Sequence, residues 1–367
     1  MAGSPDRAPM VMTRSRRLLA VGVATAVLLA ACGGDATGDD ADRAADDVET
    51  PAAEPSADTA SAEEGEGADQ PAGGADDGGT ITVQDATGEV TIPVTDEGVY
   101  VLDEIAALTM LILDVEPIGV ERFAEAGSVT PIFDAEGVDA IPAGSLEPIA
   151  AARPDLILGI SHPRSTGVRD QHAAIAPVVY PDFTGTWLDQ MDLFAVATGR
   201  MERATRVAEV IDERVAELRG RVDEAGLTGS TASVVQFQAG GYYAHDPSTL
   251  IGTLLDELGF VRSELQSGDG GFGYIPLSEE TLGAETDADV VFGIIDTEGT
   301  GLSVFDSPTV DVSDTPHTVV TDMWIANHAF AAWLMLDDIE AVLFGDGSAA
   351  TVDEILASWE AFKAAVG

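Results

Sequence analysis

The chain has 367 residues, and 45% of them are hydrophobic, which is enough for two domains with apolar cores of their own. Acidic residues outnumber basic residues 65 to 17, giving a formal net charge of -48. A protein this negative repels phosphate backbones and anionic lipid surfaces. The composition therefore excludes nucleic-acid binding as the function.

The first 32 residues have the pattern of an export signal. Arginines within residues 14–17 precede a short apolar run over residues 18–31, and Cys32 follows that run. The run is too short to span a bilayer comfortably. Residues 29–32 read LAAC, a lipobox pattern, in which the cysteine becomes the lipidated first residue of the mature protein. We expect an extracytoplasmic protein that is lipid-anchored to the cell membrane through Cys32, exported by either the general or the twin-arginine route.

Residues 33–79 differ sharply in composition from the rest of the chain. They are almost entirely Ala, Asp, Glu, Gly, Pro, Ser and Thr, and Val48 is their one large aliphatic residue. Such a segment cannot bury enough apolar surface to offset the entropy of ordering it. We expect a disordered acidic tether between the anchor and the folded body, and an acidic interaction tail stays open as an alternative.

From residue 80 onward, short apolar runs alternate with helical patterns. Strands are expected at 99–102, 117–120, 156–160 and 178–180, and helices at 104–113 and 146–152. This alternation predicts a first α/β lobe with a parallel sheet over residues 80–185.

A helical linker is expected over residues 186–229. Residues 187–198 form its first helix, and residues 200–222 form a second, longer helix without an internal Gly or Pro before Gly220. In the longer helix, apolar residues recur in steps of three and four: Ala204, Val207, Ala208, Ile211, Val215 and Leu218. This spacing predicts one long amphipathic helix.

The alternating pattern then restarts and predicts a second α/β lobe over residues 230–367. Strands are expected at 233–237 and 290–294, and helices at 249–257, 278–282, 327–343 and 351–366. The fold class expected from the residues is therefore α/β, with two halves separated by a long helix.

Several blocks of the body are similar to one known family. They are residues 105–120 (IAALTMLILDVEPIGV), 146–158 (LEPIAAARPDLIL), 171–180 (QHAAIAPVVY), 254–260 (LLDELGF) and 287–292 (DADVVF), together with Trp187 and the helices that follow it. In this order they resemble the periplasmic-binding proteins that deliver iron siderophores and cobalamin to ABC importers. The resemblance implies two Rossmann-like lobes joined by a single long α-helix, with the ligand in the cleft between the lobes. It implies binding and release of a ligand, without catalysis.

Candidate ligand residues follow from the rule that ligands bind outside the carboxyl ends of the strands in an open α/β sheet. The aromatic, cationic and polar residues expected in these loops are Arg122, Phe123, His162, Arg164, Phe183, Trp187, Gln238, Tyr242, Tyr243, His245 and Asp296. We expect a ferric siderophore held mainly by Arg164 and Arg122, with Trp187 and Tyr243 covering its apolar parts. Because arginines are few, a neutral or cationic hydroxamate chelate fits at least as well as a highly charged catecholate.

The resemblance also implies partners. Family members dock on the importer permease through one exposed acidic residue on each lobe, and Glu147 matches the first-lobe position. Glu264 is the expected second-lobe residue, with Glu257 as its rival. We expect a monomer that binds a small-molecule iron chelate and carries no catalytic residue, resident metal or cofactor.

Four other functions stand as alternatives. Heme or cobalamin could occupy the same fold. A metal-ion importer component would gather several ligands, whereas the five histidines are scattered through the sequence. The glycines at 268, 270 and 273 spell G-x-G-x-x-G but follow a polar stretch, so they indicate a loop near the cleft mouth and not a dinucleotide site. Enzymatic activity is the least favoured hypothesis, because the sequence contains no nucleophile-elbow motif.

Overall fold

The structure is a computed structural model that describes residues 79–122, 129–161, 167–238, 240–295, 303–310, 316–319, 322–345 and 347–367. The expected signal sequence, Cys32 and nearly all of the tether lie outside these ranges. Residues 69–367 belong to one compact unit. Among the helices so described, none is long and apolar enough to cross a membrane.

The first lobe is built on a five-stranded sheet in which all strands are parallel. Its strand order is β5-β4-β3-β6-β7, with β3 Val99–Val101, β4 Gly119–Arg122, β5 Ala140–Pro142, β6 Leu156–Leu158 and β7 Val178–Val179. The helices of this lobe are α1 Glu104–Ile112, α2 Thr130–Glu136, α3 Leu146–Ala152 and α5 Arg169–Ala173. The parallel arrangement expected for this half is therefore confirmed.

A buried carboxylate fixes α1 at the carboxyl edge of this sheet. Asp103 caps the helix by accepting a hydrogen bond from the Ala106 amide at 2.8 Å, and its second oxygen accepts from the Ile160 amide, just beyond β6, at 2.8 Å. Burial raises the pKa of Asp103 to about 6, although these backbone hydrogen bonds oppose the shift. Asp103 thus ties the ends of two neighbouring strands together beside the cleft.

A hairpin of β1 Thr80–Asp85 and β2 Gly88–Pro93 precedes the first sheet. It was not predicted, although its alternating residues are typical of a half-buried strand pair. The Asp85 carboxylate accepts from Thr87 in the turn and from the Tyr180 amide at 3.1 Å. The hairpin is therefore held to the end of β7.

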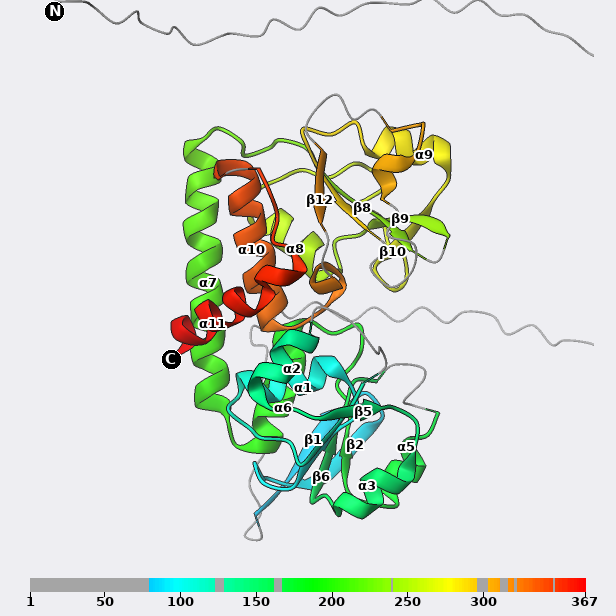
Figure 1. Cartoon of the computed structure of the whole chain (residues 1–367), viewed down its shortest axis with the longest axis vertical. Helices are drawn as coiled ribbons and strands as arrows, with labels where there is room; N and C mark the ends of the chain where they lie inside the picture. The colour runs from blue at the N-terminus through cyan, green and yellow to red at the C-terminus, as the bar shows by residue number, and fades with distance from the viewer. Residues whose placement is uncertain are drawn as a thin grey trace, which may run out of the picture. The chain divides into compact units, whose positions relative to one another are not determined.

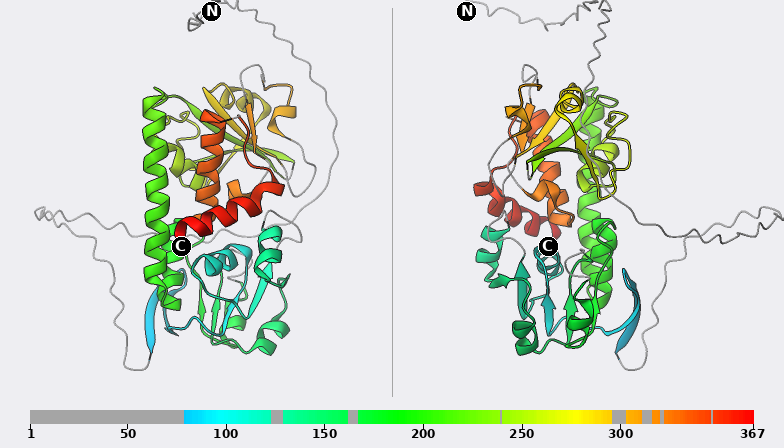
Figure 2. Two further views of the ribbon diagram at one scale, coloured as in Figure 1. Left: turned by 60° about the vertical axis from the view of Figure 1, so that its left-hand side comes forward. Right: turned by 90° about the vertical axis from the view of Figure 1, so that its right-hand side faces the viewer.

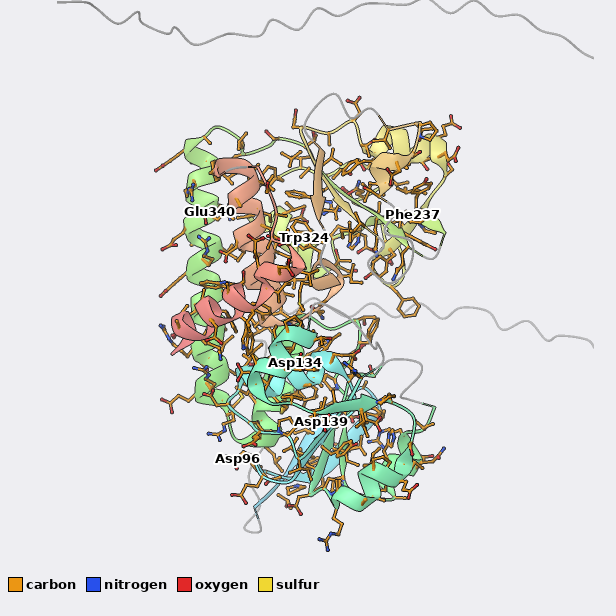
Figure 3. The ribbon with its side chains drawn as sticks, in the orientation of Figure 1. Asp96, Asp134, Asp139, Phe237, Trp324 and Glu340 are labelled. Atoms are coloured by element: carbon orange, nitrogen blue, oxygen red, sulfur yellow. The ribbon has the colours of Figure 1, made fainter. Side chains whose placement is uncertain are left out.

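Helix α6 (Trp187–Thr198) leads into α7 (Met201–Glu224), which leaves the first lobe and enters the second. At 1.5 Å per residue its 24 residues span about 36 Å. In both views of Figure 2 it runs past both lobes. The buried stripe contains the expected residues Ala204, Val207, Ile211 and Leu218. Arg214 and Arg221 both pair with Glu340, which Figure 3 labels beside α7.

The second lobe has a five-stranded mixed sheet with the order β10-β9-β8-β11-β12. Figure 1 labels β8, β9, β10 and β12 of this sheet. Its strands are β8 Ala232–Gln238, β9 Gly241–His245, β10 Tyr274–Leu277, β11 Val290–Ile294 and β12 Pro316–Val319, and its helices are α8 Leu250–Glu257 and α9 Glu279–Glu285. Strand β11 pairs parallel with β8 and β12, whereas β9 pairs antiparallel with β8 and with β10. The antiparallel pair was not predicted. The turn between β8 and β9 contains Gly240 with a φ of 79°, a conformation that favours glycine.

The C-terminal part consists of η1 Val304–Asp306, η2 Asp322–Ile325, α10 Ala329–Phe344, η3 Val352–Glu354 and α11 Ile355–Val366. Helix α10 packs on α7 and α8, and α11 reaches α2 of the first lobe. There the Glu136 carboxylate accepts from the Trp359 indole at 2.6 Å and from Lys363 at 2.5 Å. The lobes are therefore joined by α7 and also held by this contact of α11 with α2.

Candidate functional site

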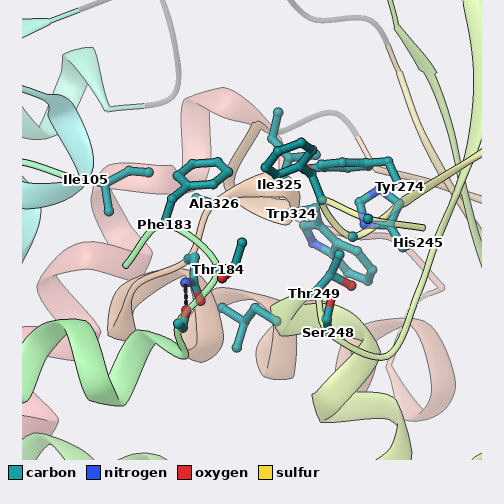
Figure 4. Close-up of a pocket in the computed structure, with 16 residues that line it drawn as sticks. Ile105, Phe183, Thr184, His245, Ser248, Thr249, Tyr274, Trp324, Ile325 and Ala326 are labelled. Carbon is teal, nitrogen blue, oxygen red and sulfur yellow. Dashed lines mark hydrogen bonds between the residues drawn. The ribbon is translucent and has the colours of Figure 1, made fainter. Parts of the chain in front are cut away.

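A cavity of about 100 Å³ opens between the two lobes (Figure 4). The first lobe contributes Ile105 and residues 183–185, the second lobe contributes His245 and residues 248–250 and 271–274, and the segment before α10 contributes residues 324–327. Ligand pockets usually measure some 300–1,000 Å³. In this conformation the cavity can therefore enclose part of a large ligand and leave the remainder at its mouth.

The first-lobe wall is a short loop that three side chains hold in place. The buried Gln190 amide donates to the carbonyls of Asp182, Phe183 and Gly185 at 2.9, 3.4 and 3.3 Å. The Phe183 amide donates to the Ser161 hydroxyl at 2.7 Å. Asn327 donates to the Gly185 carbonyl at 2.9 Å and so connects this wall to the segment before α10. The phenyl ring of Phe183 is therefore carried by a fixed backbone.

The second-lobe wall depends on the buried Asp246. One carboxylate oxygen accepts from the Ser248 amide and hydroxyl at 2.8 and 2.6 Å, and the other accepts from the Gly270 amide at 2.7 Å. Burial alone would raise the pKa of Asp246, but these hydrogen bonds lower it below its usual value. Asp246 stays ionised at neutral pH and joins the start of α8 to the glycine loop.

His245 lies beneath the surface of this wall and has no exposed area. Its Nε2 is 3.1 Å from the Gln236 amide oxygen, and its ring meets the edge of Tyr274 at 5.0 Å. Burial, followed by the nearby Arg262 guanidinium, lowers its pKa to about 3, so the ring is neutral. It supports Tyr274 from below and belongs to the cavity lining although it has no solvent-exposed area.

Trp324 forms the floor of the cavity and is almost completely buried. Its indole donates to Asp338 at 2.6 Å, and its ring packs on Phe292 at 4.9 Å. Burial raises the pKa of Asp338 to about 6, against the effect of hydrogen bonds from the Ala350 amide and Trp324. The same carboxylate thus orients the floor of the cavity and the segment that leads to α11.

The described lining combines aromatic rings, aliphatic side chains, hydroxyls, one imidazole and one amide. Its aromatic and polar members that are not buried include Phe183, Thr184, Ser248, Phe272, Tyr274 and Asn327. No Asp, Glu, Lys or Arg belongs to the lining that the structure describes. Within the same part of the chain, no three His, Cys, Asp or Glu side chains are placed to hold a metal ion. Such a lining suits a ligand with apolar surface and hydrogen-bonding oxygens.

Comparison with known proteins identifies the family. The sequence model of the Periplasmic binding protein family matches residues 123–305. A curated Bacillus subtilis (strain 168) protein, "Probable siderophore-binding lipoprotein YfiY", is 30% identical over 225 residues, covering 58% of this chain and 68% of that protein. The chain belongs to the periplasmic binding protein family. Its membership makes it a binding protein and not an enzyme.

Solved structures agree on the fold of this periplasmic binding protein. Staphylococcus aureus SirA complexed with staphyloferrin B has a TM-score of 0.59 at 22% identity, covering 71% of this chain and 98% of that one. The FhuD protein from S. pseudintermedius has a TM-score of 0.62 at 15% identity, covering 73% and 99%. At these identities the likeness shows the fold alone. It confirms the expected architecture of two α/β lobes with a long connecting helix.

Some of the residues expected at the ligand site line the cavity, and others do not. Phe183 and His245 belong to the cavity lining. Trp187 is the first residue of α6 and packs on the main core, and Arg122 ends β4 outside the lining. Phe123, His162, Arg164 and Asp296 lie outside the described residues.

The expected loop position of Gln238, Tyr242, Tyr243 and His245 was wrong. Gln238 ends β8 and the other three belong to β9, because the chain turns back at Gly240 and pairs with β8. Tyr242 packs on Phe237 at 5.2 Å, which places it in the second-lobe core cluster and not in the cavity. The Gly-Gly pair at 240–241 was the available signal for this hairpin.

Proposed function

We propose that this periplasmic binding protein captures a ferric siderophore outside the cytoplasmic membrane and delivers it to the permease of an ABC importer. The observation that carries the proposal is the cavity between the lobes, lined by aromatic rings, hydroxyls and an amide. Its 30% identical relative is named as siderophore-binding, and SirA was solved with staphyloferrin B. Both names support the same ligand class for this chain.

The charge of the molecule favours a neutral or cationic chelate, such as a ferric trihydroxamate. The described lining carries no ionised side chain, and the net charge of the chain is -48. A highly anionic catecholate would approach against this field, and few local cations would compensate. The segments after β4, β6 and β11 contain one arginine against three acids, namely Arg164 against Glu125, Asp296 and Glu298.

Mass spectrometry of the protein purified from its iron-starved host tests this function. We expect iron and an organic chelator to co-purify in equal amounts with the protein. Co-purification of heme or cobalamin instead would contradict the proposal.

Arg164 is proposed to contact the chelating oxygens. It lies three positions after Ser161, whose hydroxyl holds the first-lobe wall of the cavity. A charge-assisted hydrogen bond contributes about 1.5–3 kcal/mol, so Arg164→Ala should weaken ferric-chelate binding by roughly 10- to 100-fold. Arg206→Ala, on the exposed side of α7, is the matched control and should bind like wild type in calorimetric titration. Wild-type affinity in Arg164→Ala would remove Arg164 from the site.

The lipid anchor is proposed at Cys32. Cys32→Ala should move the protein from the membrane fraction to the soluble extracytoplasmic fraction, because no acyl chains would then hold it. Ligand affinity should stay unchanged, since the cavity belongs to the folded body. Fractionation followed by immunoblotting measures the outcome. Retention of the variant in the membrane fraction would place the anchor elsewhere.

A further inference from the structure

Phe272 exposes an unusually large apolar surface at the cavity mouth. Its side chain is 66% exposed, more than any other large hydrophobic residue that the structure describes. It lies in the glycine loop, residues 268–273, whose glycines follow the pattern G-x-G-x-x-G. The proposed function does not otherwise explain this loop. An exposed phenyl ring contributes nothing to folding, whereas covering it with a ligand would be favourable.

Hydrogen bonds fix the two ends of this segment, and the Gly271 amide at its tip donates to the neighbouring Asp269 carboxylate at 2.8 Å. On one side the Gly270 amide donates to the buried Asp246 carboxylate at 2.7 Å, and on the other the Asp246 amide donates to the Gly273 carbonyl at 3.0 Å. Gly271 and Gly273, on either side of Phe272, both have a φ of 87°, which residues other than glycine rarely adopt. A Cβ on Gly271 would meet nothing within 4 Å. Phe272 therefore stands on a short tip with open space beside it.

A second aromatic ring faces Phe272 from the other lobe. The ring of Phe183 lies 6.5 Å from that of Phe272, centroid to centroid, with an angle of 60° between the planes. Carbon atoms in contact are about 3.5–4.0 Å apart, so a flat group between two parallel rings needs roughly 7–8 Å. A small rotation of the glycine tip would supply this spacing, whereas the Phe183 loop is held by Gln190 and Ser161.

We propose that Phe272 and Phe183 form an aromatic clamp that closes on an apolar, flat portion of the ligand, with Phe272 as the moving and specificity-determining residue. Asp246 is a positioning residue that holds the base of the clamp. This inference rests on the proposed function of the cavity as a ligand site. Closure of the Phe272 ring over bound ligand mainly slows ligand release, because the ring must swing away before the ligand leaves.

The test measures association and dissociation rates by stopped-flow fluorescence on the full-length protein. Ligands are ferrioxamine B, a ferric tris-catecholate, heme and cobalamin, each with wild type, Phe272→Ser and Val261→Ser. Val261 is the matched control, because its side chain is 50% exposed on the same lobe and outside the cavity. Loss of the buried phenyl surface should raise the dissociation rate of Phe272→Ser about tenfold and leave the association rate within twofold. Val261→Ser should match wild type.

Phe272→Trp supplies the rescue variant and should restore slow dissociation, because it returns a flat ring to the same tip. A wild-type dissociation rate in Phe272→Ser overturns the clamp, even if cellular uptake falls. If wild type binds only heme or cobalamin and Phe272→Ser releases that ligand faster, the siderophore proposal fails and the clamp stands. If wild type binds none of the four ligands, both fail.

Discussion

Glu147→Arg is expected to abolish ligand uptake by cells, while the purified protein keeps its ligand affinity within twofold of wild type. Glu147 is exposed in the first turn of α3, and α3 contributes no residue to the described cavity lining. The proposed role of this carboxylate is to meet an arginine of the permease, so reversing its charge replaces attraction with repulsion. Losing an acid from a first helical turn costs only about 0.3–1 kcal/mol, so the fold persists.

The measurement is uptake of radiolabelled ferric chelate, paired with calorimetric titration of the same variants. Glu213→Arg, an exposed change on α7, is the control and should transport normally. Glu264→Arg should behave like Glu147→Arg. Glu257 ends α8 near Asp212 and Arg219 of α7, so its carboxylate faces the long helix, and we expect Glu257→Arg to transport. Normal uptake by Glu147→Arg would show that docking uses another surface.

Gly252→Ala is expected to destabilise the folded body by about 3 kcal/mol. Gly252 is buried in α8, and a Cβ there would stand 2.2 Å from the Asp246 carbonyl oxygen and 2.9 Å from the Pro247 Cα. Both obstacles are backbone atoms, and the Asp246 side chain is held by Ser248 and Gly270. Neither the helix nor the cavity wall can move aside without breaking these hydrogen bonds.

Thermal unfolding followed by circular dichroism measures the effect. For a body of this size, about 3 kcal/mol corresponds to a fall in Tm of roughly 6–12 °C. Gly220→Ala is the matched control, because Gly220 is an exposed residue of α7 and a Cβ there would meet nothing within 4 Å. It should stabilise the protein by about 0.5–1 kcal/mol through better helix propensity. A wild-type Tm in Gly252→Ala would mean that α8 is not held against Asp246.

The sequence predicted those helices and strands that depend on the local spacing of apolar residues. The three- and four-residue spacing from Ala204 to Leu218 predicted α7, which begins and ends within two residues of the expected bounds. Apolar runs of three to five residues predicted β3, β6 and β11, because strands buried on both faces need continuous apolar side chains. The hairpins β1-β2 and β8-β9 were missed, since their polar and glycine residues weaken the strand pattern.

The cavity could be predicted only in part, because its residues meet through contacts across long stretches of chain. Phe183 was expected from its position after β7. Trp324 was not expected in the cavity. Its position on the floor depends on contacts with Asp338 of α10 and Phe292 of β11, and no local sequence pattern indicates these contacts. Asn327 reaches Gly185 across 142 positions, and no local pattern indicates such a contact. The glycine loop was expected near the cleft mouth, but nothing in the sequence showed that Phe272 would face Phe183.

Tryptophan fluorescence titration tests the central claim most directly. Trp324 is one of four tryptophans and the one that lines the cavity, so an iron chelate bound there should quench its emission. We predict saturable quenching with one equivalent of a neutral or cationic ferric trihydroxamate, much weaker quenching with a ferric tris-catecholate, and loss of most of the signal change in Trp324→Phe. Saturable quenching by heme or cobalamin alone, with no response to any ferric siderophore, would contradict the proposed function.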